Sequence, residues 1–150
     1  MSMENLQANV ALKQNSVSAS ELQQLLAVVD REIADCHVTG ISWDARFRHA
    51  YGATSQLCMV ALRAKGFRPR EWERAHELCI QSLRHTLGNA FAEIGDRLLR
   101  CSGIVEAMYE RVGVVSAQDA RELVETAKKL RIDVVAWLKS NHADLVPANI

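Results

Sequence analysis

Apolar residues recur at alternating intervals of three and four along most of the chain, which places them on one face of an α-helix. The pattern predicts amphipathic helices over residues 18–38, 42–65, 70–87, 89–112 and 116–138. Ser18 with Glu21 and Ser116 with Asp119 have the spacing of helix-capping residues, and Gly66 follows a helix end. Because the connections are short, successive helices are expected to be antiparallel. We therefore predict an all-α fold over residues 18–140, an up-and-down antiparallel four-helix bundle core with a fifth helix.

The fourth predicted helix has the most regular pattern. Its apolar seam runs from Phe91 to Val112, and Gly103 does not interrupt it. We predict one continuous helix over this segment.

The two ends of the chain lack such a pattern. Residues 1–17 are polar and aperiodic, so we expect a flexible N-terminal tail, and we expect residues 141–150 to form a loose C-terminal tail. No part of the fold prediction depends on either segment.

Composition supports a helical domain without disulfides. The 150 residues are 49% hydrophobic but only 5% aromatic, with 7 glycines and 2 prolines, and this length can bury a sizeable core. The cysteines Cys36, Cys58, Cys79 and Cys101 lie on or beside apolar stripes and form no C-x-x-C pair. We expect four buried thiols, with redox or metal roles as the less favoured reading. The histidine and cysteine spacings predict no metal site, and no cofactor is expected.

The net charge of the whole chain does not favour a polyanionic partner, because 18 Lys and Arg residues balance 18 Asp and Glu residues. The N-terminus lacks a basic region followed by an apolar core, and no apolar run approaches the roughly 18 residues of a membrane span. We expect a soluble cytoplasmic protein that does not contact membranes.

Three segments carry a family resemblance: "SWDARFRHAYGATSQLCMVALRAKGFRP" (42–69), "AHELCIQSLRHTLG" (75–88) and "VVSAQDARELVETAKKLRIDVVAWL" (114–138). Their order and content resemble the HEPN superfamily, the higher eukaryote and prokaryote nucleotide-binding domains, particularly a stand-alone bacterial branch. The resemblance implies a helical bundle that forms a homodimer through faces of small residues such as those of "AYGAT" (50–54). It also implies a partner protein of the nucleotidyltransferase or antitoxin type.

Family members that cut RNA carry an arginine, a polar residue and then a histidine near the end of the penultimate helix; the branch resembled here often has Arg-Asn followed by a tyrosine. When Tyr109 is placed on that tyrosine, Ile104 and Val105 stand where Arg-Asn is expected. Arg100 lies nine residues before Tyr109, a rise of about 13 Å on a continuous helix. We therefore predict that the ribonuclease motif is lost and assign no catalytic residue.

Other pairs of arginine and histidine in the sequence are weak evidence for a catalytic site. Arg31 with His37 and Arg70 with His76 match the family spacing, but chance alone supplies about one such match in a chain of this composition. Arg48 and His49 are expected to be solvated surface residues.

Two groups of residues are candidates for ligand binding. The first is a cleft between the second and fourth predicted helices, lined by Tyr51, Arg97, Arg100 and Tyr109. The second is a basic loop able to contact a phosphate or an RNA backbone, formed by Arg63, Lys65, Arg68, Arg70 and Arg74 with the aromatic residues Phe67 and Trp72. The alternative for the loop is that Phe67 packs under the helix end and Trp72 points into the core. The arginines are then solvated or paired with Glu71, Glu73 and Glu77.

These observations favour a non-enzymatic HEPN-like binding protein that contacts a partner protein or a nucleotide or RNA ligand. Two alternatives remain open. One is a metal-independent, toxin-like ribonuclease with a rearranged site around Arg100 or around Arg70 and His76, and the other is a nonspecific RNA-binding helical module.

Overall fold

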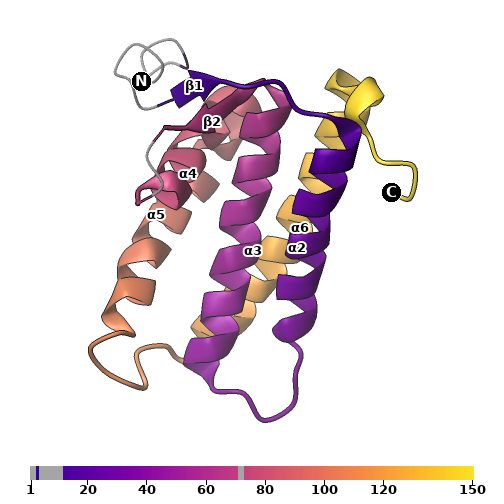
Figure 1. The fold of residues 1–150 in the computed structure, drawn as a ribbon. Helices are drawn as coiled ribbons and strands as arrows, with labels where there is room; N and C mark the ends of the chain where they lie inside the picture. Colours follow the sequence, from indigo (N-terminus) through magenta and orange to yellow (C-terminus); the bar gives the residue numbers. More distant parts are fainter. Residues whose placement is uncertain (1–2, 4–11, 71–72) are drawn as a thin grey trace.

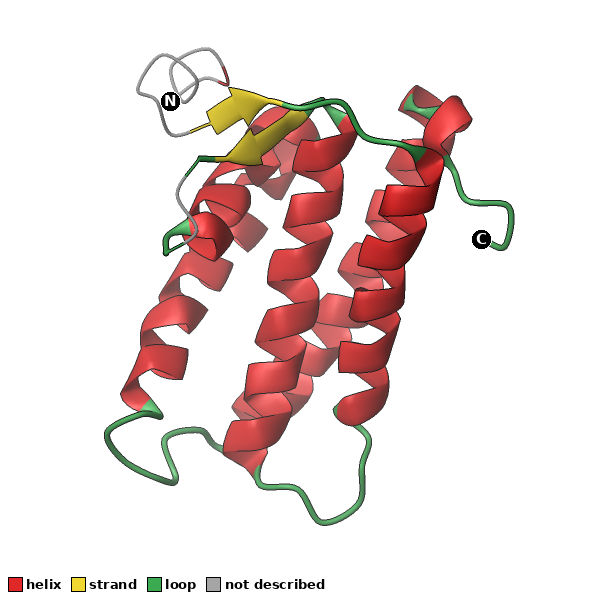
Figure 2. Cartoon of the chain, in the orientation of Figure 1, coloured by secondary structure: helices red, strands yellow, loops and turns green. Residues whose placement is uncertain are grey.

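The computed structural model describes residue 3 and residues 12–70 and 73–150 of the chain (Figure 1). Helices dominate this part of the chain (Figure 2). They are α2 (Ala19–Asp35), α3 (Trp43–Ala64), α4 (Ala75–Thr86), α5 (Ala92–Ala107) and α6 (Ala117–Asn141), with the short 3-10 helices η1 (Asn89–Phe91) and η2 (Ala143–Leu145). The predicted all-α fold, a bundle core with a fifth helix, is confirmed. Within the described residues, no helix combines the length and apolar content needed to cross a bilayer.

α3 is the central helix of the bundle. It packs against α2, α4 and α6 and also contacts α5, and Figure 1 shows it between the α4–α5 pair and the α2–α6 pair. Ala50, Ala53 and Ala61 are completely buried on α3, and such small side chains let neighbouring helices approach closely. The small-residue face that the family resemblance assigns to dimerisation is thus used for packing inside the chain.

The predicted helix starts at serines are confirmed. The Ser18 hydroxyl accepts a hydrogen bond from the Glu21 backbone N–H at 3.1 Å, and the Glu21 carboxylate accepts one from the Ser18 N–H at 3.0 Å. Ser116 caps α6 by accepting from the backbone N–H of Asp119 at 3.1 Å. These bonds satisfy amide groups that have no partner within the helix.

The third predicted helix begins later than expected. α4 starts at Ala75, and the preceding residues form strand β2 (Phe67–Pro69), which pairs antiparallel with β1 (Leu12–Gln14). The N-terminal segment expected to be an unstructured tail therefore contributes a strand. Proline fixes its own backbone angle and restricts the residue before it, which favours extended structure over a helix around Pro69. Trp72, expected to point into the core, lies outside the described residues.

The prediction of a continuous fourth helix through Val112 is wrong. The segment opens with η1, α5 begins at Ala92 and ends at Ala107, and Val112 is 94% exposed. The chain turns instead at Gly113, whose φ of +70° suits glycine. The carboxylate of Asp44 on α3 holds this turn by accepting hydrogen bonds from three successive backbone N–H groups, those of Gly113, Val114 and Val115.

The C-terminal segment contacts the bundle. α6 extends to Asn141, beyond the predicted end, and is followed by η2. Leu145, Val146 and Ile150 pack against the hydrophobic core. Residues 141–150, expected to form a loose tail, thus bury apolar surface against the domain.

The prediction of four buried thiols is confirmed, since Cys36, Cys58, Cys79 and Cys101 are all free and buried. Burial raises the pKa of the Cys36 thiol to about 11 and that of Cys79 to about 12. Neutral thiols of this kind act as small hydrophobic side chains.

Candidate ligand-binding groove

Two adjoining cavities of about 450 and 430 Å³ open beside α3. They share five lining residues, Tyr51, Gln56, His76, Val105 and Tyr109, and we call the combined space the Tyr51–Tyr109 groove. α3, α4, α5 and the turn after α5 all contribute to its walls. The early end of α5 creates this arrangement, because Tyr109 belongs to the turn that follows the helix and not to an apolar helical face.

The two tyrosines have different surroundings. Tyr51 is buried and its ring meets that of His76 edge-on, with centroids 6.3 Å apart. Tyr109 is 81% exposed, and the Arg48 guanidinium lies 5.6 Å from the centre of its ring. Burial, followed by the charge of Glu77, raises the pKa of Tyr51 to about 12. The Tyr51 hydroxyl is therefore a neutral hydrogen-bonding group at physiological pH.

The wall formed by α4 and α5 is acidic. Glu73, Glu77 and Glu106 line the 450 Å³ cavity, and Glu77 lies 3.8 Å from Arg74, which does not line it. Among the described residues, Arg48 is the one arginine or lysine that lines either cavity of the groove. Partial burial lowers the pKa of His76 below its ordinary value, which keeps this imidazole neutral at pH 7. The groove as a whole carries an excess of negative charge.

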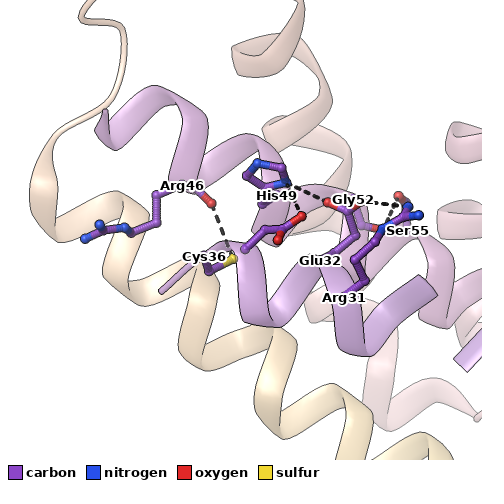
Figure 3. Close-up of polar contacts among 8 residues, drawn as sticks. Arg31, Glu32, Cys36, Arg46, His49, Gly52 and Ser55 are labelled. Carbon is purple, nitrogen blue, oxygen red and sulfur yellow. Dashed lines mark hydrogen bonds and ion pairs between the residues drawn. The ribbon is translucent and has the colours of Figure 1, made fainter. Parts of the chain in front are cut away.

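A second polar cluster adjoins the groove where α2 meets α3. Figure 3 shows the His49 ring of α3 directed toward Glu32 of α2, with Nδ1 of His49 2.7 Å from Oε2 of Glu32. Nη2 of Arg31 donates to the other carboxylate oxygen of Glu32 at 3.2 Å. Oδ2 of Asp35 lies 4.0 Å from the same Nδ1 atom of His49. We call Glu32, Asp35 and His49 the α2–α3 cluster.

Gly52 makes room for this cluster. A Cβ atom at position 52 would stand 3.3 Å from Oε2 of Glu32, closer than most real contacts of that kind. The glycine on α3 thus lets the Glu32 carboxylate lie against the helix, next to His49.

The structure brings together half of the ligand cleft predicted from the sequence. Tyr51 and Tyr109 line one groove, but Arg97 and Arg100 do not line it. Both arginines are exposed on α5, and the Arg97 guanidinium donates to the hydroxyl of Thr126 on α6. Arg97 and Arg100 lie on α5 itself, whereas Tyr109 belongs to the turn after α5 that borders the groove.

The groove also contains residues that the predicted cleft did not include. Arg48 and His49, expected to be solvated, line the 430 Å³ cavity together with Glu32 and His76. These four side chains come from three helices, and no local spacing connects them. The sequence offered two signals, the cluster around Arg48 and His49 and the spacing of Arg70 and His76.

The basic loop is partly neutralised by ion pairs. Arg63 is mostly buried and its Nη2 atom lies 3.6 Å from Glu21, and Nε of Arg74 lies 3.8 Å from Glu77. Arg68 lies within β2, while Lys65 and Arg70 are exposed. Arg63 and Arg74 are thus engaged with carboxylates, which supports the alternative in which the arginines of the loop are paired rather than a phosphate-binding surface.

Comparisons of this chain with protein-family models, with curated proteins and with solved structures found no match. The resemblance to the HEPN superfamily therefore stays an expectation from the sequence, and the function must be argued from the groove itself.

Proposed function

We propose that this protein is a non-enzymatic binding protein whose Tyr51–Tyr109 groove receives a positively charged side chain of a partner protein. The observation that carries the proposal is the acidic wall beside an exposed aromatic residue: Glu73, Glu77 and Glu106 line the cavity that Tyr109 borders. Carboxylates form charge-assisted hydrogen bonds with arginine and lysine, and aromatic faces attract the same cations. An arginine side chain combines both interactions.

The same charges disfavour a nucleotide or RNA in this part of the groove. A phosphate would bring negative charge next to Glu77 and Glu106, and like charges repel most strongly where water is partly excluded. Arg48, together with the Arg74 that pairs with Glu77, does not compensate for the three carboxylates of Glu73, Glu77 and Glu106. Of the two kinds of ligand expected from the sequence, a partner protein and a nucleotide or RNA, we therefore propose the partner protein.

The family resemblance adds two expectations to this proposal, a homodimer and a partner of the nucleotidyltransferase or antitoxin type. The first can be tested directly by measuring the mass of the purified protein in solution by light scattering. If the protein is a monomer at every concentration measured, the expected homodimer is refuted, while the proposal for the groove is unaffected.

Binding of charged peptides tests the groove. We expect a fluorescein-labelled tetra-arginine peptide to bind in the presence of a chelator, and a tetra-glutamate peptide not to bind. Glu106→Gln should weaken arginine-peptide binding by about fivefold, the equivalent of ~1 kcal/mol for a partly exposed ion pair. Glu93→Gln is the matched control, because Glu93 is exposed on the same helix and does not line the groove. Equal affinity of both variants, or no binding by the wild type, would refute the proposal.

A second candidate function is supported by one specific observation. Arg48, His49 and His76 line the same 430 Å³ cavity, and an arginine with an imidazole is the pairing that RNA cleavage without a metal needs. The guanidinium would bind the scissile phosphate, and the imidazole would take the proton of the 2′-hydroxyl.

Incubation with labelled RNA in the presence of chelator separates the two candidates. If the protein is a ribonuclease of this kind, His76→Ala abolishes cleavage and Arg100→Ala, which changes an exposed residue outside the groove, leaves it intact. Absence of cleavage by the wild type would remove this candidate. Cleavage lost only in Arg100→Ala would favour the rearranged motif considered from the sequence.

A further inference from the structure

The geometry points to a divalent transition-metal site in the α2–α3 cluster, formed by Glu32, Asp35 and His49. In the described part of the chain, these three residues present one nitrogen and two carboxylate oxygens that all lie within 4.8 Å of one another. This site is separate from the cation-binding role proposed above, because it uses a different set of atoms and would hold a metal ion directly.

Two helices supply the ligands in a compact arrangement. Glu32 and Asp35 are three residues apart near the end of α2, a spacing that places them on one helix face. His49 faces them from α3, with Nδ1 at 2.7 Å from Oε2 of Glu32 and 4.0 Å from Oδ2 of Asp35. Bonds of about 2.0–2.2 Å to one ion separate neighbouring ligand atoms by roughly 3–3.5 Å. The two distances lie on either side of that range, so side-chain rotations suffice to form the site.

The surroundings leave Oε2 of Glu32 available to an ion. Arg31 holds Oε1 of Glu32 at 3.2 Å, which leaves Oε2 directed at His49. Gly52 keeps the space beside Oε2 open. Glu32 and His49 also line the 430 Å³ cavity, which gives an ion a route of entry and room for water at the remaining coordination positions.

The three ligand atoms determine which class of metal ion the site can bind. One imidazole nitrogen with two carboxylate oxygens suits zinc, cobalt or manganese, whereas calcium and magnesium prefer oxygen ligands alone. The two carboxylates carry two negative charges toward a divalent ion, with Arg31 paired to the outer oxygen of Glu32. The ion takes the lone pair of Nδ1, so the His49 proton moves to Nε2 or is released, and the hydrogen bond to Glu32 is replaced by two metal bonds.

Titration of the purified full chain with Co²⁺ tests the site, because visible absorption bands report on nitrogen and oxygen coordination. We expect a one-to-one complex that Zn²⁺ displaces. His49→Ala should abolish the bands and Asp35→Asn should weaken binding by tenfold or more. His142→Ala is the matched control, since His142 packs on Trp137 at the end of α6 and contributes no ligand.

A second readout guards against loss of folding in the variants. In the wild-type protein, nitrogen-15 spectra of the histidine rings should show a large shift of Nδ1 of His49 on addition of Zn²⁺. Unchanged His49 signals, or equal cobalt binding by His49→Ala and the wild type, would overturn the inference. Because the peptide experiment is carried out with chelator, failure of the metal site and failure of the groove proposal are distinguishable.

Discussion

Asp44 in the first turn of α3 accepts a hydrogen bond at 2.8 Å from the backbone N–H of Gly113, 69 residues later in the chain. The same carboxylate also binds the N–H groups of Val114 and Val115, at 3.3 and 3.0 Å. This contact fixes the connection from α5 to α6. It is therefore a stabilising element that also positions one side of the groove.

Asp44→Ala should lower the midpoint of thermal unfolding by several degrees, because three backbone N–H groups lose their acceptor. Circular dichroism at 222 nm measures the change. Asp133→Ala is the control, since Asp133 pairs with Lys129 within one turn of α6 and such a pair contributes little. Equal effects of the two substitutions would contradict a special role for Asp44.

The Asp44 contact should also make stability depend on pH. Although desolvation acts in the opposite direction, the three backbone hydrogen bonds lower the pKa of Asp44 below its ordinary value of 3.8. A carboxyl group whose pKa is lower in the folded than in the unfolded state stabilises the protein at pH values above its unfolded-state pKa. This contribution is lost as the pH falls through its folded-state pKa. Urea unfolding at a series of pH values should show a decline below about pH 4 that is smaller in Asp44→Asn.

Leu57→Ala should destabilise the protein by about 2–5 kcal/mol, because Leu57 is completely buried on the central helix and the truncation leaves a cavity. Urea denaturation gives the free energy of unfolding. Ile132→Ala provides the comparison, since Ile132 is 67% exposed on α6 and should change stability by no more than ~0.5 kcal/mol. A large effect at position 132 would show that this surface is covered in solution.

The Asp30 and Arg131 side chains form a two-point contact between α2 and α6, with distances of 2.6 and 3.1 Å. A double-mutant cycle with Asp30→Ala and Arg131→Ala should give a coupling energy of about 0.5–1 kcal/mol, because both groups are partly exposed. The coupling should fall as salt concentration rises. A coupling that is independent of salt would mean that the pair is more shielded than its exposure indicates.

The buried thiols should be unreactive in the folded protein, since the thiolate is the reactive form and burial raises the pKa of Cys36 to about 11. The reagent DTNB should therefore modify the native protein slowly and all four cysteines quickly after unfolding in guanidinium. Cys36→Ala should not change the native rate. Rapid modification of one thiol in the native protein would contradict this prediction.

Local sequence signals determined much of the fold. Ser18 and Ser116 marked helix starts correctly because capping depends on residues only three apart. The strand pairing of residues 12–14 with 67–69 and the end of α5 depend on partners more than 50 residues away along the chain. The pattern from Phe91 to Val112 was regular enough to predict a longer helix, but the chain turns at Gly113, where the Asp44 carboxylate holds the backbone of residues 113–115.

The candidate site was harder to predict for the same reason. Tyr51 and Tyr109 were predicted to line one cleft and both line the groove, but Arg97 and Arg100 lie outside it, and His76 was considered only with Arg70 for a ribonuclease site. The α2–α3 cluster combines Glu32 and Asp35 with a histidine from the next helix, so a search for a histidine or cysteine three or four residues from another ligand does not find it. Its recognition required the packing of α2 on α3.

β1 and η2 lie at the end of the bundle opposite the connection between α5 and α6 (Figure 1). The aromatic ring of Tyr109 belongs to that connection. Immobilising the protein on a sensor chip through a label near either of these two elements would therefore leave the Tyr109 end facing the solution, where an incoming macromolecule can reach it without obstruction from the support.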